Sequence, residues 1–385
     1  VIDMTVESVE GNTATMYIPE CYNYEVAGTT IKWYSDVSPY TGQRYWSISD
    51  LSGYHTQRED TVQGIKFGAG NGNAALKGVA SIEDLGNHRV KITYNSKAGE
   101  VQNGMCFQSR PTVRDHAGTF FWKSKDIRMT SLDIQFLHGF GMVGQHSENI
   151  TMEDVDFEAP KESGRTTAGY ADFVQMSGCK GAININNCTF AGPHDDPINI
   201  HGTCSRIMEV LSPTRIKCKF MQDMSEGMEW GRPDEMIGFI EHNTMRTVAT
   251  GKMNKFEALN KAEFIIELSA PLPAGVEAGY VIENLTCTPD AEIRNCHFGS
   301  CRARGLLVST PGKVVIENNI FESSGSAILI AGDANAWYES GAVKDVLIRN
   351  NDFRYPCNSS IYQFCEAVIS IDPEIPTPEQ KYPYH

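Results

Sequence analysis

The chain has 385 residues, a formal net charge of −15 at neutral pH, 41% hydrophobic residues and 34 glycines. This hydrophobic content is enough for an extended core, and no apolar run reaches the roughly 18 residues of a membrane span. The acidic balance argues against a nucleic-acid partner, because phosphate binding requires a basic surface.

Residues 1–105 alternate apolar and polar side chains, as half-buried antiparallel strands do. The alternation is clearest in TATMYIPECYNYEV, which starts at Thr13, and in HRVKITYNSKAG, which starts at His88. We predict a small β-domain that precedes, or is inserted into, the next part of the chain.

A short signature recurs in the following part of the chain, namely an aliphatic strand, an Asn or acidic residue, and then Phe. It ends at Phe136, Phe157, Phe190, Phe298, Phe321 and Phe353. Most of the intervals between these positions fit one coil of a stacked β-solenoid, with or without a loop, and the long gap between Phe190 and Phe298 marks an insertion. We therefore predict an all-β right-handed parallel β-helix over 106–204 and 290–385, with an ordinary β-sandwich as the alternative.

Paired asparagines precede several of these phenylalanines, at Asn186–Asn187, Asn318–Asn319 and Asn350–Asn351. Asn side chains can hydrogen-bond along a ladder of equivalent positions, and Asn tolerates the left-handed backbone of a sharp corner. We interpret these pairs as scaffold, and we expect stacks in the core at Phe157, Phe190, Phe298, Phe321 and Phe353.

Two aspartates occupy matching local sequences, Asp172 in ADFVQM and Asp196 in DDPINI, and their spacing is about one solenoid coil. On adjacent coils they would lie roughly 4.8 Å apart, with Asp195 beside them. Pro197 favours a corner at which both Asp195 and Asp196 point outward. Three carboxylates converging on a rigid surface suit acid/base chemistry on a sugar.

Residues 205–289 return to an antiparallel pattern with turn signals, as in MEVLSPTRIKCKF and AEFIIELSAPLPAGVEAGYVIENL. We predict a β-barrel-like insertion that leaves the helix after Thr203 and returns near Asp290. It would either wall the active site or serve as a packing or dimer module.

Further candidates for sugar binding surround the aspartates. His194 and His201 flank the Asp-Asp pair, and the loop GDANAWYESG offers an aromatic ring between acidic groups, which suits a pyranose. Arg304 and Arg110 would contact sugar or fix a carboxylate, whereas Arg114 and His116 receive no role. The predicted substrate-binding residues are His194, His201, Arg304, Asp333, Trp337 and Glu339.

The eleven cysteines are an odd number and include no CxxC pair of the zinc type. We expect mostly reduced, structural cysteines and no cofactor or metal, with a Cys357–Cys365 disulfide left open.

A resemblance to glycoside hydrolase family 110 is carried by SENITMEDVDF, ADFVQMSGCKGAININNCTF, HDDPINIHGT, RARGLLVSTPGKVVIENNIF and SGSAILIAGDANAWYESGAVKDVLIRNNDF. The resemblance covers residues 105–370 well and the preceding part of the chain loosely. It implies an exo-acting, metal-independent bacterial α-1,3-galactosidase of the type that acts on blood-group B antigens, with inversion and with catalytic Asp172, Asp195 and Asp196. A homodimer fits the family, and the need for the fucose branch stays open.

Inversion requires one carboxylic acid, one carboxylate and a water between them, with about 6.5–9.5 Å between the carboxyl groups. Close like charges should raise at least one carboxyl pKa, but which Asp is acid and which is base stays open. The alternatives are a calcium-dependent β-helix polysaccharide lyase, which needs oxygen ligands and a basic residue, and a non-catalytic carbohydrate-binding solenoid.

The chain starts VIDMTVESVEG, without an initiator Met or a signal peptide. Because a solenoid needs its first coil covered, we expect a longer bacterial chain that carries the first coils and an export signal. The corresponding localisation is periplasmic, cell-surface or secreted.

Overall fold

The computed structural model describes residues 1–45, 47–49, 56–57, 78–98, 101–109, 114, 116–299, 301, 303–355, 357, 367–377 and 384–385. Regular structure within these residues is β-strand, apart from 3₁₀ turns at Lys161–Ser163 and Asp223–Ser225. The all-β prediction is therefore confirmed. No helix in these described stretches has the length and hydropathy to cross a membrane.

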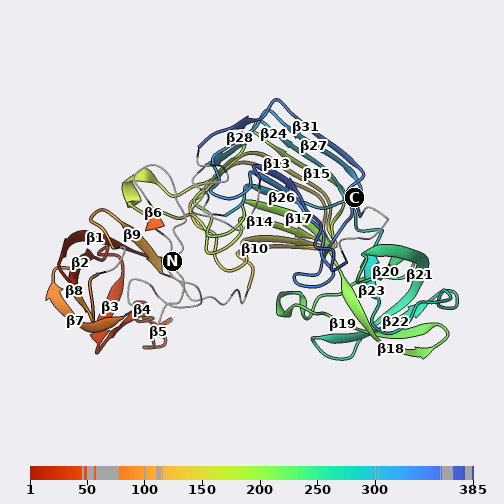
Figure 1. Ribbon diagram of the computed structural model, residues 1–385, viewed down its shortest axis with the longest axis horizontal. Coiled ribbons are helices and arrows are strands. Elements are labelled where there is room, and N and C mark those ends of the chain that lie inside the picture. Colours follow the sequence, from red (N-terminus) through yellow and green to blue (C-terminus); the bar gives the residue numbers. More distant parts are fainter. Residues whose placement is uncertain are drawn as a thin grey trace.

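The first part of the chain forms antiparallel sheets (Figure 1, red and orange). One sheet has the order β6-β9-β1-β2-β8-β7, and the other is β3-β4-β5. The alternating sequence buries one face, with Met4, Met16, Trp33 and Phe107 in the core. The strands are β1 (Ile2–Glu10), β2 (Thr13–Tyr17), β3 (Asn23–Ala27), β4 (Thr30–Tyr34), β5 (Ser47–Ser49), β6 (Thr56–Gln57), β7 (Val79–Gly86), β8 (Arg89–Tyr94) and β9 (Cys106–Ser109).

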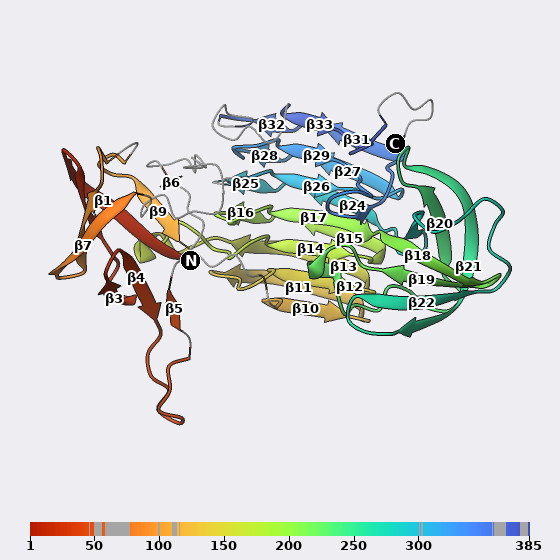
Figure 2. The ribbon, with the colours of Figure 1, turned by 60° about the horizontal axis from the view of Figure 1, so that its bottom comes forward.

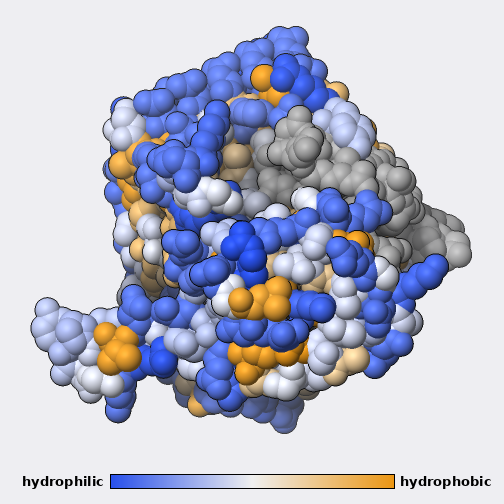
Figure 3. Space-filling view, turned by 90° about the vertical axis from the view of Figure 1, so that its left-hand side faces the viewer, coloured by the Kyte–Doolittle hydropathy of each residue, from blue (hydrophilic) through white to orange (hydrophobic). Residues whose placement is uncertain are grey.

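This N-terminal part presents a largely hydrophilic surface with scattered hydrophobic areas (Figure 3). Its contact with the rest of the molecule includes the buried Asp3 carboxylate, which accepts hydrogen bonds from the hydroxyl and the backbone N–H of Thr166 at 2.7 and 2.9 Å. Burial raises the pKa of Asp3.

Two parallel sheets are stacked in the following part of the chain and curl around one shared core (Figure 1). The first sheet has the order β10-β12-β14-β17-β26-β29-β33. Its strands are β10 (Thr119–Trp122), β12 (Met142–Gln145), β14 (Val174–Ser177), β17 (Ile198–Thr203), β26 (Leu306–Val308), β29 (Ile328–Ile330) and β33 (Ile369–Ile371).

The second sheet receives the strands that alternate in sequence with those of the first (Figure 2). Its order is β31-β27-β24-β15-β13-β16-β25-β28-β32, with β11 paired to β13. Its strands are β11 (Lys125–Ile134), β13 (Glu148–Phe157), β15 (Lys180–Asn186), β16 (Thr189–Ala191), β24 (Asp290–Arg294), β25 (His297–Gly299), β27 (Lys313–Glu317), β28 (Ile320–Phe321), β31 (Asp345–Arg349) and β32 (Asp352–Phe353). Parallel pairing between the neighbours in both orders excludes the antiparallel sandwich alternative.

A ladder of phenylalanines stacks along the core, as the sequence predicts. Neighbouring rings lie 4.6–5.4 Å apart between centroids, in the series Phe157, Phe190, Phe298, Phe321 and Phe353. The signature that ends at Phe136 is offset by two residues from the others, because Ile134 rather than Phe136 pairs with Phe157. The register Lys125↔Glu148 makes this coil longer than the interval from Phe136 to Phe157, so Phe136 falls beyond the strand.

The predicted left-handed corners are confirmed at Asn187, Asn318 and Asn350, whose φ angles are 53°, 58° and 55°. A neighbouring ladder is also present, because the Asn319 amide donates to Asn351 Oδ1 and to the Ile293 carbonyl, both at 3.0 Å. Identical side chains on successive coils thus satisfy the backbone at the corner.

A closed six-stranded antiparallel barrel lies between β17 and β24 in the sequence, with the order β18-β19-β22-β21-β20-β23. It is drawn in green and teal beside the parallel stack, on the right of the view (Figure 2). Trp230 anchors it by donating its indole N–H to the Thr203 carbonyl at 2.9 Å. The strands are β18 (Ser205–Ser212), β19 (Arg215–Lys219), β20 (Met236–Glu241), β21 (Arg246–Ala258), β22 (Glu263–Leu268) and β23 (Val281–Asn284).

Candidate active site

The three predicted carboxylates converge at the starts of two adjacent strands. Val174 on β14 pairs with Ile198 on β17, and this register sets Asp172 beside Asp196. The backbone N–H of Phe173 donates to the Asp196 carbonyl at 3.1 Å. One oxygen from each of Asp172, Asp195 and Asp196 lies within 4.8 Å of the others. The predicted convergence is confirmed, whereas the catalytic role of these residues stays a prediction.

Two arginines neutralise this acidic cluster. The Arg304 Nε donates to Asp196 Oδ1 at 2.8 Å and its Nη2 to Oδ2, so the pair is bidentate. Arg114 donates to Asp195 Oδ2, and its Nη1 lies 3.8 Å from Asp172 Oδ1. A Ca²⁺ ion on these oxygens would lie next to two guanidinium groups, so the site fits a metal poorly.

Burial shifts the pKa values of Asp172 and Asp196. It raises the pKa of Asp172 to about 8, with Arg114 opposing the shift and Asp195 and Asp196 adding to it. Burial also raises the pKa of Asp196, against the influence of Arg304. Asp195 is the most accessible, with 18% of its side chain exposed. Asp172 is therefore suited to carry a proton at neutral pH.

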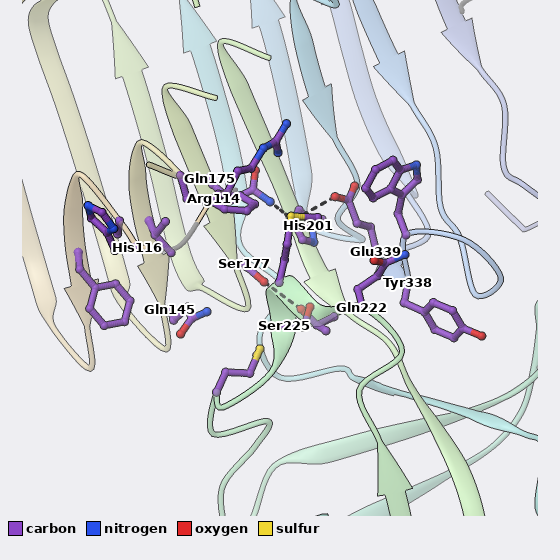
Figure 4. A pocket seen from close by; sticks show the side chains of 18 residues that line it. Arg114, His116, Gln145, Gln175, Ser177, His201, Gln222, Ser225, Tyr338 and Glu339 are labelled. Atoms are coloured by element: carbon purple, nitrogen blue, oxygen red, sulfur yellow. Dashed lines mark hydrogen bonds and ion pairs between the residues drawn. The ribbon is translucent and has the colours of Figure 1, made fainter. Parts of the chain in front are cut away.

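A cavity of about 440 Å³ adjoins the cluster, and Arg114 belongs to both. Its floor is the outward face of β12, β14 and β17, and its walls come from the barrel and from the loop of Tyr338 and Glu339 (Figure 4). The lining residues are Arg114, His116, Ala117, Phe120, Phe140, Val143, Gln145, Gln175, Ser177, His201, Thr203, Gln222, Met224, Ser225, Met228, Trp337, Tyr338 and Glu339. Barrel residues thus wall the cavity, one of the two roles considered for the insertion.

His201 stands at the centre of a polar network in this cavity (Figure 4). Its Nδ1 contacts the Gly202 carbonyl at 2.6 Å, which makes Nδ1 the protonated nitrogen, and its Nε2 then accepts from the Gln175 amide at 2.6 Å. Glu339 Oε1 lies 3.6 Å from His201 Nε2 and accepts from the Asn199 amide at 3.1 Å. The strand β30 (Glu339–Ser340), which pairs antiparallel with β17, sets this position.

The remaining predicted sugar-binding residues divide between the cavity and the interior. Trp337 lines the cavity with 50% of its surface exposed, whereas His194 is fully buried. Asp333 is also buried, and its carboxylate accepts backbone N–H groups of Asn335, Ala336, Trp337 and Tyr338. Asp333 therefore shapes the loop that presents Trp337. Arg110 and Cys365 lie outside the described residues.

Sequence reasoning missed Arg114, Gln175 and Asn199. Gln175 and Asn199 lie on the outward face of their strands, in register with each other, a position that period-2 alternation from the buried Val174 could have identified. Arg114 precedes the first described strand of the parallel stack, and no periodic signal marks it.

Comparison with known proteins shows that this chain is similar to α-1,3-galactosidases. An α-1,3-galactosidase B of Bacteroides thetaiotaomicron is 78% identical over 282 residues, which are 73% of this chain and 46% of that protein. An α-1,3-galactosidase A of Streptomyces avermitilis is 36% identical over 377 residues, covering 94% of this chain and 60% of that protein. The chain belongs to the α-1,3-galactosidase family.

The family assignment confirms the resemblance carried by the sequence motifs. The family model "GLAA-B beta-barrel domain II" matches residues 215–282, which lie within the closed barrel. An α-1,3-galactosidase A of Bacteroides fragilis is 42% identical over 252 residues, or 65% of this chain and 42% of that protein. The chain spans about half the length of the curated relatives it matches.

Proposed function

We propose that this chain carries the catalytic site of an exo-acting, inverting α-1,3-galactosidase. Its substrate would be a glycan with terminal α-1,3-linked galactose, of the blood-group B type and in linear Galα1-3Gal. The main support for this proposal is the group of three carboxylates at the edge of a cavity of about 440 Å³, with two of the carboxylates bound by arginines. The names of the relatives support the reaction class.

Asp172 is the proposed general acid, because burial keeps its carboxyl protonated near neutral pH. The spacing of the trio, within 4.8 Å between single oxygens, is shorter than the about 6.5–9.5 Å between carboxyl groups that an activated water needs. Inversion thus requires either that substrate separates Asp195 from Asp172 or that the base is Glu339, on the cavity wall. A Glu339→Gln variant with full loss of turnover would support the second arrangement, and one with near-normal turnover the first.

The turnover of the enzyme should fall as the pH rises through about 8. A general acid works only while protonated, and the raised pKa of Asp172 keeps it protonated below that value. The Arg114 charge holds this pKa down, so Arg114→Met should move the alkaline limb of kcat to higher pH. Profiles of kcat against pH for both proteins test this, and a limb that stays in place would contradict the role of Asp172.

Replacement of Trp337 by Ala should weaken substrate binding by roughly 1–3 kcal/mol, the scale for losing an aromatic contact. The effect should appear mainly in KM, since the ring supports the sugar away from the reacting bond. Trp122→Ala is the matched control, because Trp122 has the same 50% exposure and does not line the cavity. Equal kinetics for the two variants would remove Trp337 from the binding site.

Galactose release from an α-1,3-galactosyl oligosaccharide, with and without EDTA, tests the proposed reaction. Release without added calcium supports the hydrolase. Loss of activity in EDTA that calcium restores, together with an unsaturated uronate product, would indicate a polysaccharide lyase. Binding of the oligosaccharide without any release would indicate a carbohydrate-binding solenoid. Comparison of branched and linear substrates shows whether the fucose branch is required.

We further propose that the two parallel sheets are part of a right-handed parallel β-helix. The repeated parallel registers support it, because each strand pairs with the equivalent strand of the next coil. The proposed domains are 1–105, 106–204 with 290–385, and 205–289. We also propose that the protein is exported to the periplasm, the cell surface or the medium, because the proposed substrate is an extracellular glycan. A homodimer completes the proposal. Fractionation of the producing bacterium and sedimentation of the purified protein test these two points.

A further inference from the structure

A buried group of three potential ligands lies apart from the aspartate trio, where the barrel meets the first parallel sheet. His146 follows β12, Glu235 precedes β20 and Cys287 follows β23. Their relative exposures are 6%, 8% and 3%. We propose that His146, Glu235 and Cys287 form a structural site for a divalent transition-metal ion, with zinc as the best match.

The spacing of the ligand atoms fits such an ion. Cys287 Sγ lies 4.0 Å from His146 Nδ1 and 3.9 Å from Glu235 Oε1, and all three atoms lie within 4.8 Å of one another. Tetrahedral zinc at about 2.3 Å from sulfur and about 2.0–2.1 Å from nitrogen or oxygen requires ligand separations of roughly 3.6 Å. The two contacts to sulfur need to shorten by only a few tenths of an ångström to reach this value, and a water would complete the coordination.

The surroundings of His146 fix the imidazole for this role. Its Nε2 contacts the Glu229 carbonyl, and only a protonated nitrogen bonds to a carbonyl. Nδ1 is therefore the nitrogen with the lone pair, and Nδ1 faces Cys287. A metal-binding histidine usually donates its other N–H to a carbonyl or carboxylate in this way.

The other two ligands are oriented as well. Glu235 Oε2 accepts from the Asn284 amide at 2.7 Å and from the Arg232 backbone N–H at 2.9 Å, which leaves Oε1 to face the sulfur. The Cys287 backbone N–H donates to Asn284 Oδ1 at 3.2 Å. Asn284 thus holds both ligands, as groups around metal sites do.

Hydrogen bonding alone leaves this group incomplete. The Cys287 thiol has one hydrogen, but it faces two acceptors, His146 Nδ1 and Glu235 Oε1. A bound cation satisfies the thiolate, the carboxylate and the imidazole together. Because His146 belongs to the parallel stack and the other two to the barrel, the ion would pin these parts together.

The experiment uses the untagged full chain, stripped of metal and titrated with Co²⁺ and then Zn²⁺. We expect about one equivalent of Co²⁺ to bind with the thiolate-to-cobalt absorption band, and Zn²⁺ to abolish that band. Saturating Zn²⁺ should raise the thermal midpoint by about 3–6 °C, the scale for a ligand at about 100 times its Kd. The absence of a thiolate band with the folded chain would overturn the proposal.

Variants locate the ion. Cys287→Ala and His146→Gln should each bind Co²⁺ at least tenfold more weakly and lose the zinc-dependent shift, whereas Cys218→Ala, which alters a buried cysteine of the barrel core, should keep both. If one site variant fails to fold, the other still decides. Unchanged binding by a folded site variant would overturn the proposal, whatever the outcome of the galactosidase assay.

Discussion

Replacement of Asp172, Asp195 or Asp196 by Asn is expected to lower the turnover of an α-1,3-galactoside by roughly 10²–10⁴-fold in each case, the usual loss on removing a general acid or base. The reason is positional as well as chemical. The three carboxylates share one site. Arginine side chains form ion pairs with Asp195 and Asp196, and burial keeps Asp172 protonated. Asn retains the shape of each side chain but neither donates nor accepts the proton.

Asp352→Asn is the matched control for these variants. Asp352 starts a strand of the same parallel stack but is exposed and pairs with Arg354 at 2.7 Å, so its replacement should leave turnover unchanged. Initial rates of galactose release and far-UV circular dichroism together separate catalysis from folding. Loss of activity in only one of the three site variants would defeat the shared role of the trio and leave the hydrolase assignment in place.

The anomeric form of the released galactose tests the mechanism itself. Attack by water at the anomeric carbon of an α-galactoside gives β-galactose first, which proton NMR detects before mutarotation. Initial release of α-galactose would indicate a covalent intermediate and retention. The short spacing within the trio makes this measurement decisive.

The second large effect is expected at Arg304. Replacement by Met leaves the Asp196 carboxylate, which is 2% exposed, without its bidentate partner. Removal of one member of a buried ion pair typically costs about 3–5 kcal/mol of unfolding free energy. Arg304 also lowers the pKa of Asp196, so the variant should bind a proton there more readily.

The higher pKa of Asp196 in the Arg304→Met variant sets the sign of the pH dependence of its stability. A carboxyl whose pKa is raised in the folded state gives stability at low pH that is lost as the pH rises. The destabilisation by Arg304→Met should therefore be larger at pH 8 than at pH 5 in urea denaturation. Arg349→Met is the control, because Arg349 is 53% exposed and its partner Glu317 keeps Arg294, so its effect should stay below about 1 kcal/mol. Equal stabilities of the two variants would contradict the importance of the Asp196 pair.

Repetition made much of the fold predictable. The spacing of phenylalanines and asparagines predicted the stacking ladder and the left-handed corners, and the coil-length spacing brought Asp172 to Asp196. A stacked strand places residues at equal offsets side by side, so a local pattern fixes a long-range contact. The signature at Phe136 is offset from the repeat, because the residue that pairs with Phe157 is Ile134.

The sequence by itself determined the all-β class, the parallel stack and the convergence of the aspartates, because each depends on periodicity along one chain. Only the tertiary structure decided what surrounds them. Arg114 reaches the aspartates from outside the periodic segments. The Asp333 carboxylate accepts backbone hydrogen bonds within its own loop and does not face the cavity. His146 meets Glu235 and Cys287, which are distant in the sequence, because the barrel folds back onto the first sheet. Contacts between separate modules depend on how their surfaces pack, and no repeat within either module encodes that packing.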